Sequence, residues 1–418
     1  MLSRRALKAI NVKALAALKR FNATKATKPL QGIRVLELGQ IKIEPPKIGD
    51  PLRIWRNLDA DGQSPWFRSM ARNKKSVCID LKTKEGRNLV KRLAEKSDVL
   101  IENFKPGTME KWGLGPEDIY PANPKLIYTR ISGYGQTGPY SKRPGYASVC
   151  EGMGGFRFIN GHPGQPPVRP NMSLGDSLAG LHATLGVLLS LVAKNKLDQS
   201  YAKRTGQVVD VAIYESMLNM MESVIPEYDR FNQIRQPSGT TLTGIVPTNT
   251  YPCKDGKHVI IGGNGDSIYV RLMNAIGRSD LTGEKYKFNS DRVKEQEVID
   301  GAISAWTSER TTEQVLEILE KVSVPAGKIY DAKDIVEDEH INARGMIENI
   351  TVGSEADGRG WSLKVPGMSP VLNTTPGSTE WAGPDLGAHT KEVLKEVLGL
   401  SEQDIAKLNV NGTTKFDE

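Results

Sequence analysis

The chain has little cysteine, and none of it is spaced for metal or disulfide chemistry. Its 418 residues include three cysteines, Cys78, Cys150 and Cys253, and no CxxC pair. This spacing argues against a disulfide framework and a zinc site, and it suits a reducing compartment. GxxxxGK(S/T), HExxH and GxSxG sequences are also absent, and the five histidines are isolated. We therefore expect no metal and no redox cofactor.

Acidic residues are missing from the first part of the chain. Residues 1–28 carry eight cations and no acid, and the first acidic residue is Glu37. Setting those eight aside lowers the basic residues from 56 to 48, against 49 acidic ones, so we infer no nucleic-acid surface. Leu7, Ile10, Leu15 and Leu18 lie near one helical face. We predict that residues 1–28 are a mitochondrial transit peptide directing the protein to the matrix; a basic surface helix is the alternative.

No apolar run has the length of an ordinary membrane span. The longest, from Leu178 to Ala193, is interrupted by His182 and followed by Lys194. A bilayer span needs about 20 apolar residues. We therefore predict a buried core helix and no membrane partner.

Helical and strand patterns alternate along the chain, which predicts an α/β fold with a Rossmann-like, mainly parallel sheet. A helix is expected over 83–96, with strands over 99–101, 126–128 and 207–211. Ligands bind beyond the carboxyl ends of such strands. Three strand exits are therefore candidates: Gly39-Gln40, 103–107 and 132–135. Simple turn chemistry is the alternative for each exit.

Pro-rich and Gly-rich stretches at 160–170 and 236–243 suggest connections. We predict a large domain formed by 29–227 and 331–418, with a smaller α+β domain, 228–330, inserted between them. In the smaller domain, the sequence predicts a strand over 256–261 and helices over 269–276 and 312–322.

Two glycine-rich segments resemble ligand-binding loops. Gly133-Tyr134-Gly135-Gln136-Thr137-Gly138 matches a dinucleotide fingerprint, but Pro139 and Pro144 exclude the helix that would hold a pyrophosphate. We reject that interpretation. Gly262, Gly263 and Asn264 follow a predicted strand and offer N–H groups for an oxyanion. An ordinary strand-to-helix turn is the alternative.

Asp176 is the candidate catalytic residue, because it stands where a long apolar helix begins. Unpaired N–H groups and the helix dipole stabilise an ionised carboxylate there. The alternative is that Asp176 is only a helix cap.

Five ordered motifs resemble class III CoA-transferases of the CaiB/BaiF type, the family of formyl-CoA transferase and carnitine CoA-transferase. The resemblance runs from about Gly32 to about Asn411. The motifs are Arg72-Asn73-Lys74-Lys75-Ser76 with Ile79-Asp80-Leu81-Lys82, Glu102-Asn103-Phe104-Lys105-Pro106-Gly107, Ile131 to Pro139, Arg143-Pro144-Gly145-Tyr146, and the Asp176 segment.

The resemblance implies that Asp176 attacks an acyl-CoA thioester, giving an acyl-aspartyl anhydride and then an aspartyl-CoA thioester, from which a free carboxylic acid takes the CoA. Succinyl-CoA is a plausible donor by the same resemblance, which also implies an interlocked homodimer. The loop at Gly262, Gly263 and Asn264 would cover the anhydride. Six further positions match CoA-contacting residues of the family: Lys82, Asn103, Phe104, Lys111, Tyr146 and Ala147.

Two features depart from the family pattern. Related 2-methylacyl-CoA racemases carry a histidine where Tyr146 stands, which disfavours racemisation. The first crossover helix is also missing, because only Gly39-Gln40 separates Val35–Leu38 from Ile41–Ile43. Parallel neighbours need a crossover of about a dozen residues, so these strands cannot pair in the family manner; they could form one continuous strand or an irregular link. Either a segment is missing from the sequence, as through a mispredicted exon, or the protein is a catalytically impaired homologue that binds CoA or a partner.

Overall fold

The computed structural model describes residues 28–37, 41–197, 205–353 and 360–416. The predicted transit peptide, apart from Lys28, lies outside these residues. Contacts divide the chain into two compact units. Unit 1 joins the described residues up to Leu100 with those from Arg344 onward, and unit 2 comprises Ile101–Ala343. Residues 101–227, which the sequence assigns to the large domain, thus group with the segment 228–330.

The largest sheet has seven strands in the order β12-β3-β2-β1-β4-β5-β6. β2 is parallel to β3 and β5 is parallel to β6, whereas β12 is antiparallel to β3. The mixed α/β class and the mainly parallel sheet are confirmed. The strands are β1 (Val35–Glu37), β2 (Ile41–Glu44), β3 (Lys75–Ile79), β4 (Val99–Glu102), β5 (Ile127–Ser132), β6 (Val208–Ala212) and β12 (Thr414–Lys415).

The first two strands pair although no crossover helix separates them. β1 and β2 are parallel neighbours, with Leu36 opposite Ile41 and Glu37 opposite Lys42. The pairing covers these two residue pairs alone. The long-crossover rule applies to strands paired along their length.

Unit 1 contains α3 (Lys84–Glu95), which follows the predicted helix closely. The Thr83 hydroxyl accepts a hydrogen bond from the N–H of Gly86 and caps the helix. Gly86 has no room for a side chain, because a Cβ there would lie 2.1 Å from the carbonyl oxygen of Asp80. α3 and α17 (Thr390–Leu398) both pack against β3.

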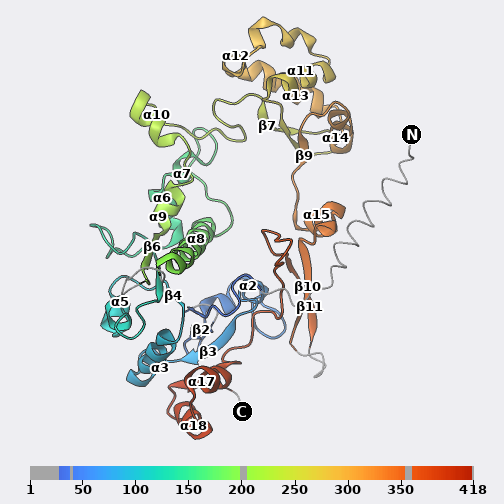
Figure 1. The fold of residues 1–418 in the computed structure, drawn as a ribbon. Coiled ribbons are helices and arrows are strands. Elements are labelled where there is room, and N and C mark those ends of the chain that lie inside the picture. The colour runs from blue at the N-terminus through green and yellow to red at the C-terminus, as the bar shows by residue number, and fades with distance from the viewer. Residues whose placement is uncertain (1–27, 38–40, 198–204, 354–359, 417–418) are drawn as a thin grey trace. The chain divides into compact units, whose positions relative to one another are not determined.

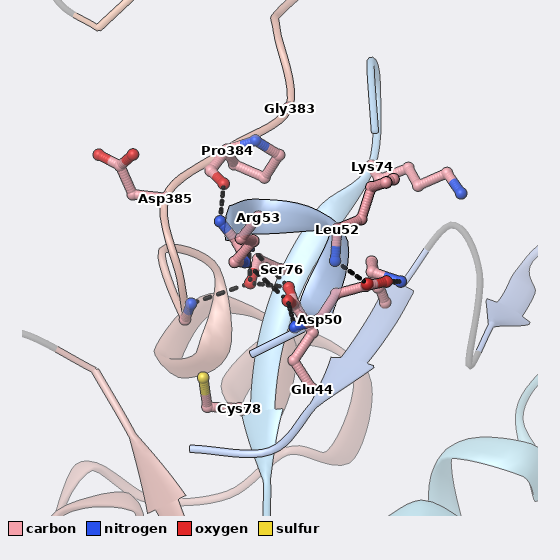
Figure 2. A network of polar contacts seen from close by, with 12 residues as sticks. Glu44, Asp50, Leu52, Arg53, Lys74, Ser76, Cys78, Gly383, Pro384 and Asp385 are labelled. Carbon is pink, nitrogen blue, oxygen red and sulfur yellow. Dashed lines mark hydrogen bonds and ion pairs between the residues drawn. The ribbon is translucent and has the colours of Figure 1, made fainter. Parts of the chain in front are cut away.

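A buried polar network ties the start of unit 1 to its C-terminal segment (Figure 2). Arg53 donates two hydrogen bonds of 2.8 Å to the Glu44 carboxylate and one of 2.9 Å to the carbonyl of Pro384. The Ser76 hydroxyl donates to Glu44 and accepts from the N–H of Gly387. These bonds join segments that lie more than 300 residues apart in the sequence.

In unit 2, the helix α8 (Leu174–Leu197) packs against β5, β6, α6 (Ala147–Met153) and α9 (Ile213–Leu218) (Figure 1). The prediction of a buried core helix was wrong. The buried face of α8 carries the small residues Ala179 and Ala183 together with Val187, whereas five large apolar side chains are exposed. The exposed set is Leu181, Leu185, Leu188, Leu189 and Val192. Over Leu174–Lys194, α8 is also long and apolar enough to cross a membrane, by length and composition only.

The yellow-to-orange part of unit 2 in Figure 1 holds a three-stranded antiparallel sheet, β7-β8-β9. Its apolar core includes Ile261, Leu272, Ile303 and Leu319. The predicted strand and two helices are present as β8, α11 and α14. The elements are β7 (Thr248–Pro252), β8 (His258–Gly262), β9 (Ala326–Lys328), α11 (Asp266–Ala275), α12 (Asn289–Lys294), α13 (Gln296–Ser308) and α14 (Thr312–Lys321).

Unit 1 also contains a two-stranded antiparallel sheet, in which β10 pairs with β11. The bounds are α2 (Pro65–Met70), α4 (Thr108–Lys111), α5 (Pro116–Ile119), α7 (Phe156–Ile159), α10 (Val224–Phe231), α15 (Ala332–Glu337), α16 (Glu339–Ala343), β10 (Ile347–Val352), β11 (Trp361–Pro366) and α18 (Glu402–Val410).

Candidate active site

A pocket of about 350 Å³ lies in unit 2 where β4, β5 and β6 end. Two of the three predicted strand exits contribute to it. The pocket is lined by Asn103, Phe104, Lys105, Pro106, Ile131, Ser132, Gly133, Ser141, Arg143, Pro144, Gly145, Tyr146, Ala147, Asp176 and Ile213. Asp176 is the lining residue whose carboxylate can act as a nucleophile, and it stands beside aromatic, amide and cationic side chains.

Buried charges shape the wall formed after β4. Glu102 is 1% exposed, and its carboxylate accepts hydrogen bonds of 2.7 Å from the N–H of Phe104 and from Arg130. Arg130 also donates to Glu110. Burial raises the pKa of Glu102, although Arg130 favours its ionised form. The Phe104 ring meets Trp112 edge to face at 5.1 Å. This network fixes the turn that presents Asn103 and Phe104.

The turn after β5 forms the next wall. The Gly135 N–H donates to the hydroxyl of Ser132, and the Gln136 N–H donates to the Asp210 carboxylate. A Cβ on Gly133 would approach Cys150 to 3.1 Å, so the turn needs glycine there. Between β5 and α6 the chain forms no helix, as Pro139 and Pro144 predict.

Asp176 is the third residue of α8, so it is not the helix cap. The preceding Gly175 allows close packing, since a Cβ there would lie 3.1 to 3.3 Å from Ile213, Glu151 and Ala147. The N–H of Gly175 donates to Glu151 with a length of 3.3 Å. The helix start is therefore anchored while the Asp176 carboxylate makes no hydrogen bond within the described residues.

A buried carboxylate behind Asp176 was missed by the sequence analysis. Glu151 is fully buried in α6, and its Oε2 accepts no hydrogen bond from the described residues. Two arginines act as its counter-ions: Arg169 donates a hydrogen bond of 3.4 Å to Oε1, and Nε of Arg157 lies 3.6 Å from Oε2. In the sequence, no local pattern links Glu151 to Asp176, because the two residues lie 25 positions apart. Arg169 lies in the Pro-rich stretch 160–170, whose composition predicts a connection.

Burial first, and the charge of Glu151 second, raise the pKa of Asp176, while Arg169 acts in the opposite direction. Asp176 as a whole residue is exposed, so its carboxyl is only partly desolvated. Burial also raises the pKa of Cys150 to about 11. Cys150 is therefore a neutral thiol at pH 7 and no competing nucleophile.

The other predicted site residues divide into two groups. Asn103, Phe104, Tyr146 and Ala147 line the same pocket as Asp176. The remaining residues are not among its lining residues: Lys111 is exposed on α4, Lys82 follows β3 in unit 1, Gly262 is the last residue of β8, and Gly263 and Asn264 follow it.

The sequence predicts that the N–H groups of Gly262, Gly263 and Asn264 are available to an oxyanion, but two of them already make hydrogen bonds. The N–H of Gly262 donates to the carbonyl of Pro325, and that of Gly263 donates to the carbonyl of Pro247 at 2.9 Å. These two groups are therefore engaged and unavailable to an oxyanion in this conformation. Among the described residues, the N–H groups of Asn264 and Gly265 have no acceptor.

Within the same described ranges, no group of three or more His, Cys, Asp or Glu side chains is arranged to hold a metal ion. The pocket instead offers one nucleophilic carboxylate and the two cations Lys105 and Arg143. This set suits nucleophilic chemistry on an anionic substrate.

Comparisons with known proteins agree on one family. Residues 40–390 match the model of CoA-transferase family III. Succinyl-CoA–D-citramalate CoA-transferase of Chloroflexus aurantiacus is 42% identical over 400 residues, covering 91% of this chain and 97% of that protein. Succinyl-CoA:glutarate CoA-transferase of Mus musculus is 31% identical, covering 94% and 91%. The crystal structure of a CAIB/BAIF family protein from Brucella suis superposes with a TM-score of 0.75 at 27% identity, covering 89% and 100%.

Proposed function

This chain belongs to CoA-transferase family III, and from that membership we propose that it transfers CoA from succinyl-CoA to a small dicarboxylic acid through Asp176. The observation that carries the proposal is the position of the Asp176 carboxylate in a pocket at the ends of three strands, beside Asn103, Phe104 and Tyr146. The placement agrees with the general position of ligands in α/β sheets.

The reaction proceeds by alternating attacks of carboxylate and thiolate. The Asp176 carboxylate attacks the thioester carbonyl of succinyl-CoA, the C–S bond breaks, and CoA leaves as the thiolate. The thiolate then attacks the Asp176 carbonyl of the mixed anhydride, which releases succinate and leaves an aspartyl-CoA thioester. The acceptor carboxylate repeats the sequence in reverse and restores Asp176.

The surroundings of Asp176 suit this role. The desolvation that raises its pKa removes water from the carboxylate, and the absence of a hydrogen bond leaves both oxygens free to attack. The group must be ionised, so transfer falls as the pH drops through the raised pKa of Asp176. Glu151 is buried and does not line the pocket, so it acts on Asp176 without contacting the substrate.

The proposed substrates are inferred from the names of the related transferases and from the positive charges that line the pocket. Both compared transferases are named for succinyl-CoA, and their acceptors are D-citramalate and glutarate. Lys105 and Arg143 line the Asp176 pocket and suit the second carboxylate of such an acid. Asn103, Phe104, Tyr146 and Ala147 would contact the CoA arm, and Lys111 would bind its phosphates as a point charge.

We also propose that the protein is a homodimer. The outward face of α8 presents Leu181, Leu185 and Leu189, which are 53 to 66% exposed. A second copy would bury this face. A membrane is the less suitable partner, because α8 packs on β5 and β6 and would have to leave the sheet to span a bilayer. The basic leader, residues 1–28, would direct this dimer to the mitochondrial matrix.

A catalytically impaired, CoA-binding homologue is the second candidate, because the link between β1 and β2 is short. Racemisation is disfavoured by Tyr146. An exchange assay separates these functions. Full-length protein is incubated with succinyl-CoA and a panel of acids, and the CoA esters are followed by mass spectrometry. Transfer in the wild type and in Ser177→Ala, with none in Asp176→Ala, supports the proposal; transfer that survives Asp176→Ala contradicts it.

A further inference from the structure

A Pro-rich connection, residues 160–172, leads from α7 to the start of α8 in unit 2. It contains the dipeptide Pro166-Pro167 and then Arg169, which Pro170 follows directly. Proline fixes its own φ and also restricts the residue before it. The backbone on either side of Arg169 therefore has few alternative conformations.

Hydrogen bonds close the connection just before Arg169. The N–H of Val168 donates to the carbonyl of Asn160, and Nδ2 of Asn160 donates to the carbonyl of Val168, each over 3.1 Å. The carbonyl of Gly161 accepts a hydrogen bond of 2.9 Å from the N–H of Gly239. Because the backbone is already ordered here, placing the Arg169 side chain costs mainly the entropy of that side chain.

Arg169 contacts both α6 and the end of the connection. Its Nη2 donates to Oε1 of Glu151 over 3.4 Å and to the carbonyl of Met172 over 3.3 Å. The same Oε1 accepts the N–H of Gly175 over 3.3 Å, in the first turn of α8. Arg157, on α7, faces the other oxygen of Glu151 at 3.6 Å. Arg169 is thus the counter-ion of Glu151 that also holds the segment leading into α8.

We propose that Arg169 is a positioning residue for the nucleophile: it ties α6 to the segment before α8, and its charge offsets that of Glu151 at Asp176. This inference rests on the proposed CoA transfer. An offset matters because Glu151 is fully buried, where water screens its charge poorly.

The direction of the electrostatic effect follows from the groups around Asp176. Burial first and Glu151 second raise the pKa of Asp176, and Arg169 lowers it. Without Arg169, Asp176 would stay protonated up to a higher pH, and a protonated carboxyl does not attack a thioester. Other charged or titratable groups lie in the pocket, on α8 itself or on the elements packed against it, and they are the same in every variant below: Lys105, Arg130, Arg143, His182, Asp210 and Glu215.

The test is the pH dependence of kcat/KM for transfer from succinyl-CoA to glutarate by the full-length protein. We expect Arg169→Gln to move the acidic limb to higher pH by on the order of one unit, which lowers transfer about tenfold below the limb. Arg169→Lys keeps the charge and should restore the wild-type limb. Arg157→Gln is the matched control, because it removes the other counter-ion of Glu151, and its limb should move less.

A double variant separates charge from structural damage. The Arg169 side chain is 40% exposed, so its replacement should leave the fold intact. Glu151→Gln combined with Arg169→Gln removes both opposing charges and should return the limb toward the wild-type pH. An unmoved limb in Arg169→Gln, an equal shift in Arg157→Gln, or a shift that persists in the double variant would overturn the role of Arg169. Absence of transfer and of an Asp176 adduct in the wild type would instead overturn the proposed function.

Discussion

Glu151 accepts a hydrogen bond of 3.3 Å from the N–H of Gly175, the residue that precedes Asp176. A fully buried carboxylate thereby anchors the start of α8 and adds its negative charge to the surroundings of the proposed nucleophile. Arg169 and Arg157 lie 3.4 and 3.6 Å from this carboxylate and partly balance its charge. The arrangement favours a partly desolvated and therefore reactive carboxylate at position 176.

Replacement of Glu151 by glutamine tests this electrostatic role. Glutamine keeps an acceptor for Gly175 and removes the charge, so the pKa of Asp176 should fall. The acidic limb of the pH–rate profile should then move to lower pH by on the order of one unit. Besides Glu151, the charged group that acts on Asp176 is Arg169, and its charge does not change in this range. An unmoved acidic limb in Glu151→Gln would refute the coupling.

Two glycines of α8 provide a matched test of packing. Gly175→Ala places a Cβ against Ile213, Glu151 and Ala147, and we expect it to destabilise the protein by about 1–3 kcal/mol and to impair transfer. Gly180 has open space around its Cβ position, so Gly180→Ala should stabilise the helix by about 0.5–1 kcal/mol. Denaturant unfolding measures both. Equal effects would mean that the contacts at Gly175 are unimportant.

Several features followed from the sequence because they depend on local patterns. The helix at 84–95 and the strands that end at Glu102 and Ser132 are set by periodicity and turn residues. The exposed face of α8 was not predictable, because a continuous apolar run does not show which face of the helix packs against the rest of the protein. The engaged N–H groups of Gly262 and Gly263 depend on Pro325 and Pro247, which only the fold brings close.

The leucine face of α8 predicts the oligomeric state. The double substitution Leu185→Glu with Leu189→Glu should leave a protein with the mass of one chain by light scattering, because charges cannot be buried in an apolar interface without a large penalty. Val410→Glu is the control, since Val410 is 89% exposed on α18 in unit 1, and it should keep the wild-type mass. A monomeric wild type would exclude the proposed homodimer.

The buried pair in unit 1 predicts a stability effect. Glu44→Ala leaves Arg53, which is 4% exposed, without its carboxylate, and we expect a loss of about 3–5 kcal/mol in unfolding free energy. Glu402→Ala is a comparison at the surface, where loss of the pairs with Lys391 and Lys395 should change stability far less than Glu44→Ala does, because water screens exposed charges. A small effect of Glu44→Ala would mean that the network in Figure 2 contributes little.

The most direct test of the account is the chemical state of residue 176 during turnover. Full-length protein is mixed with succinyl-CoA without an acceptor, quenched with hydroxylamine, digested and mapped by peptide mass spectrometry. Conversion of the Asp176 carboxyl group to a hydroxamate is the predicted result. An unmodified Asp176, or a hydroxamate on another carboxylate while CoA exchange proceeds, would contradict the account.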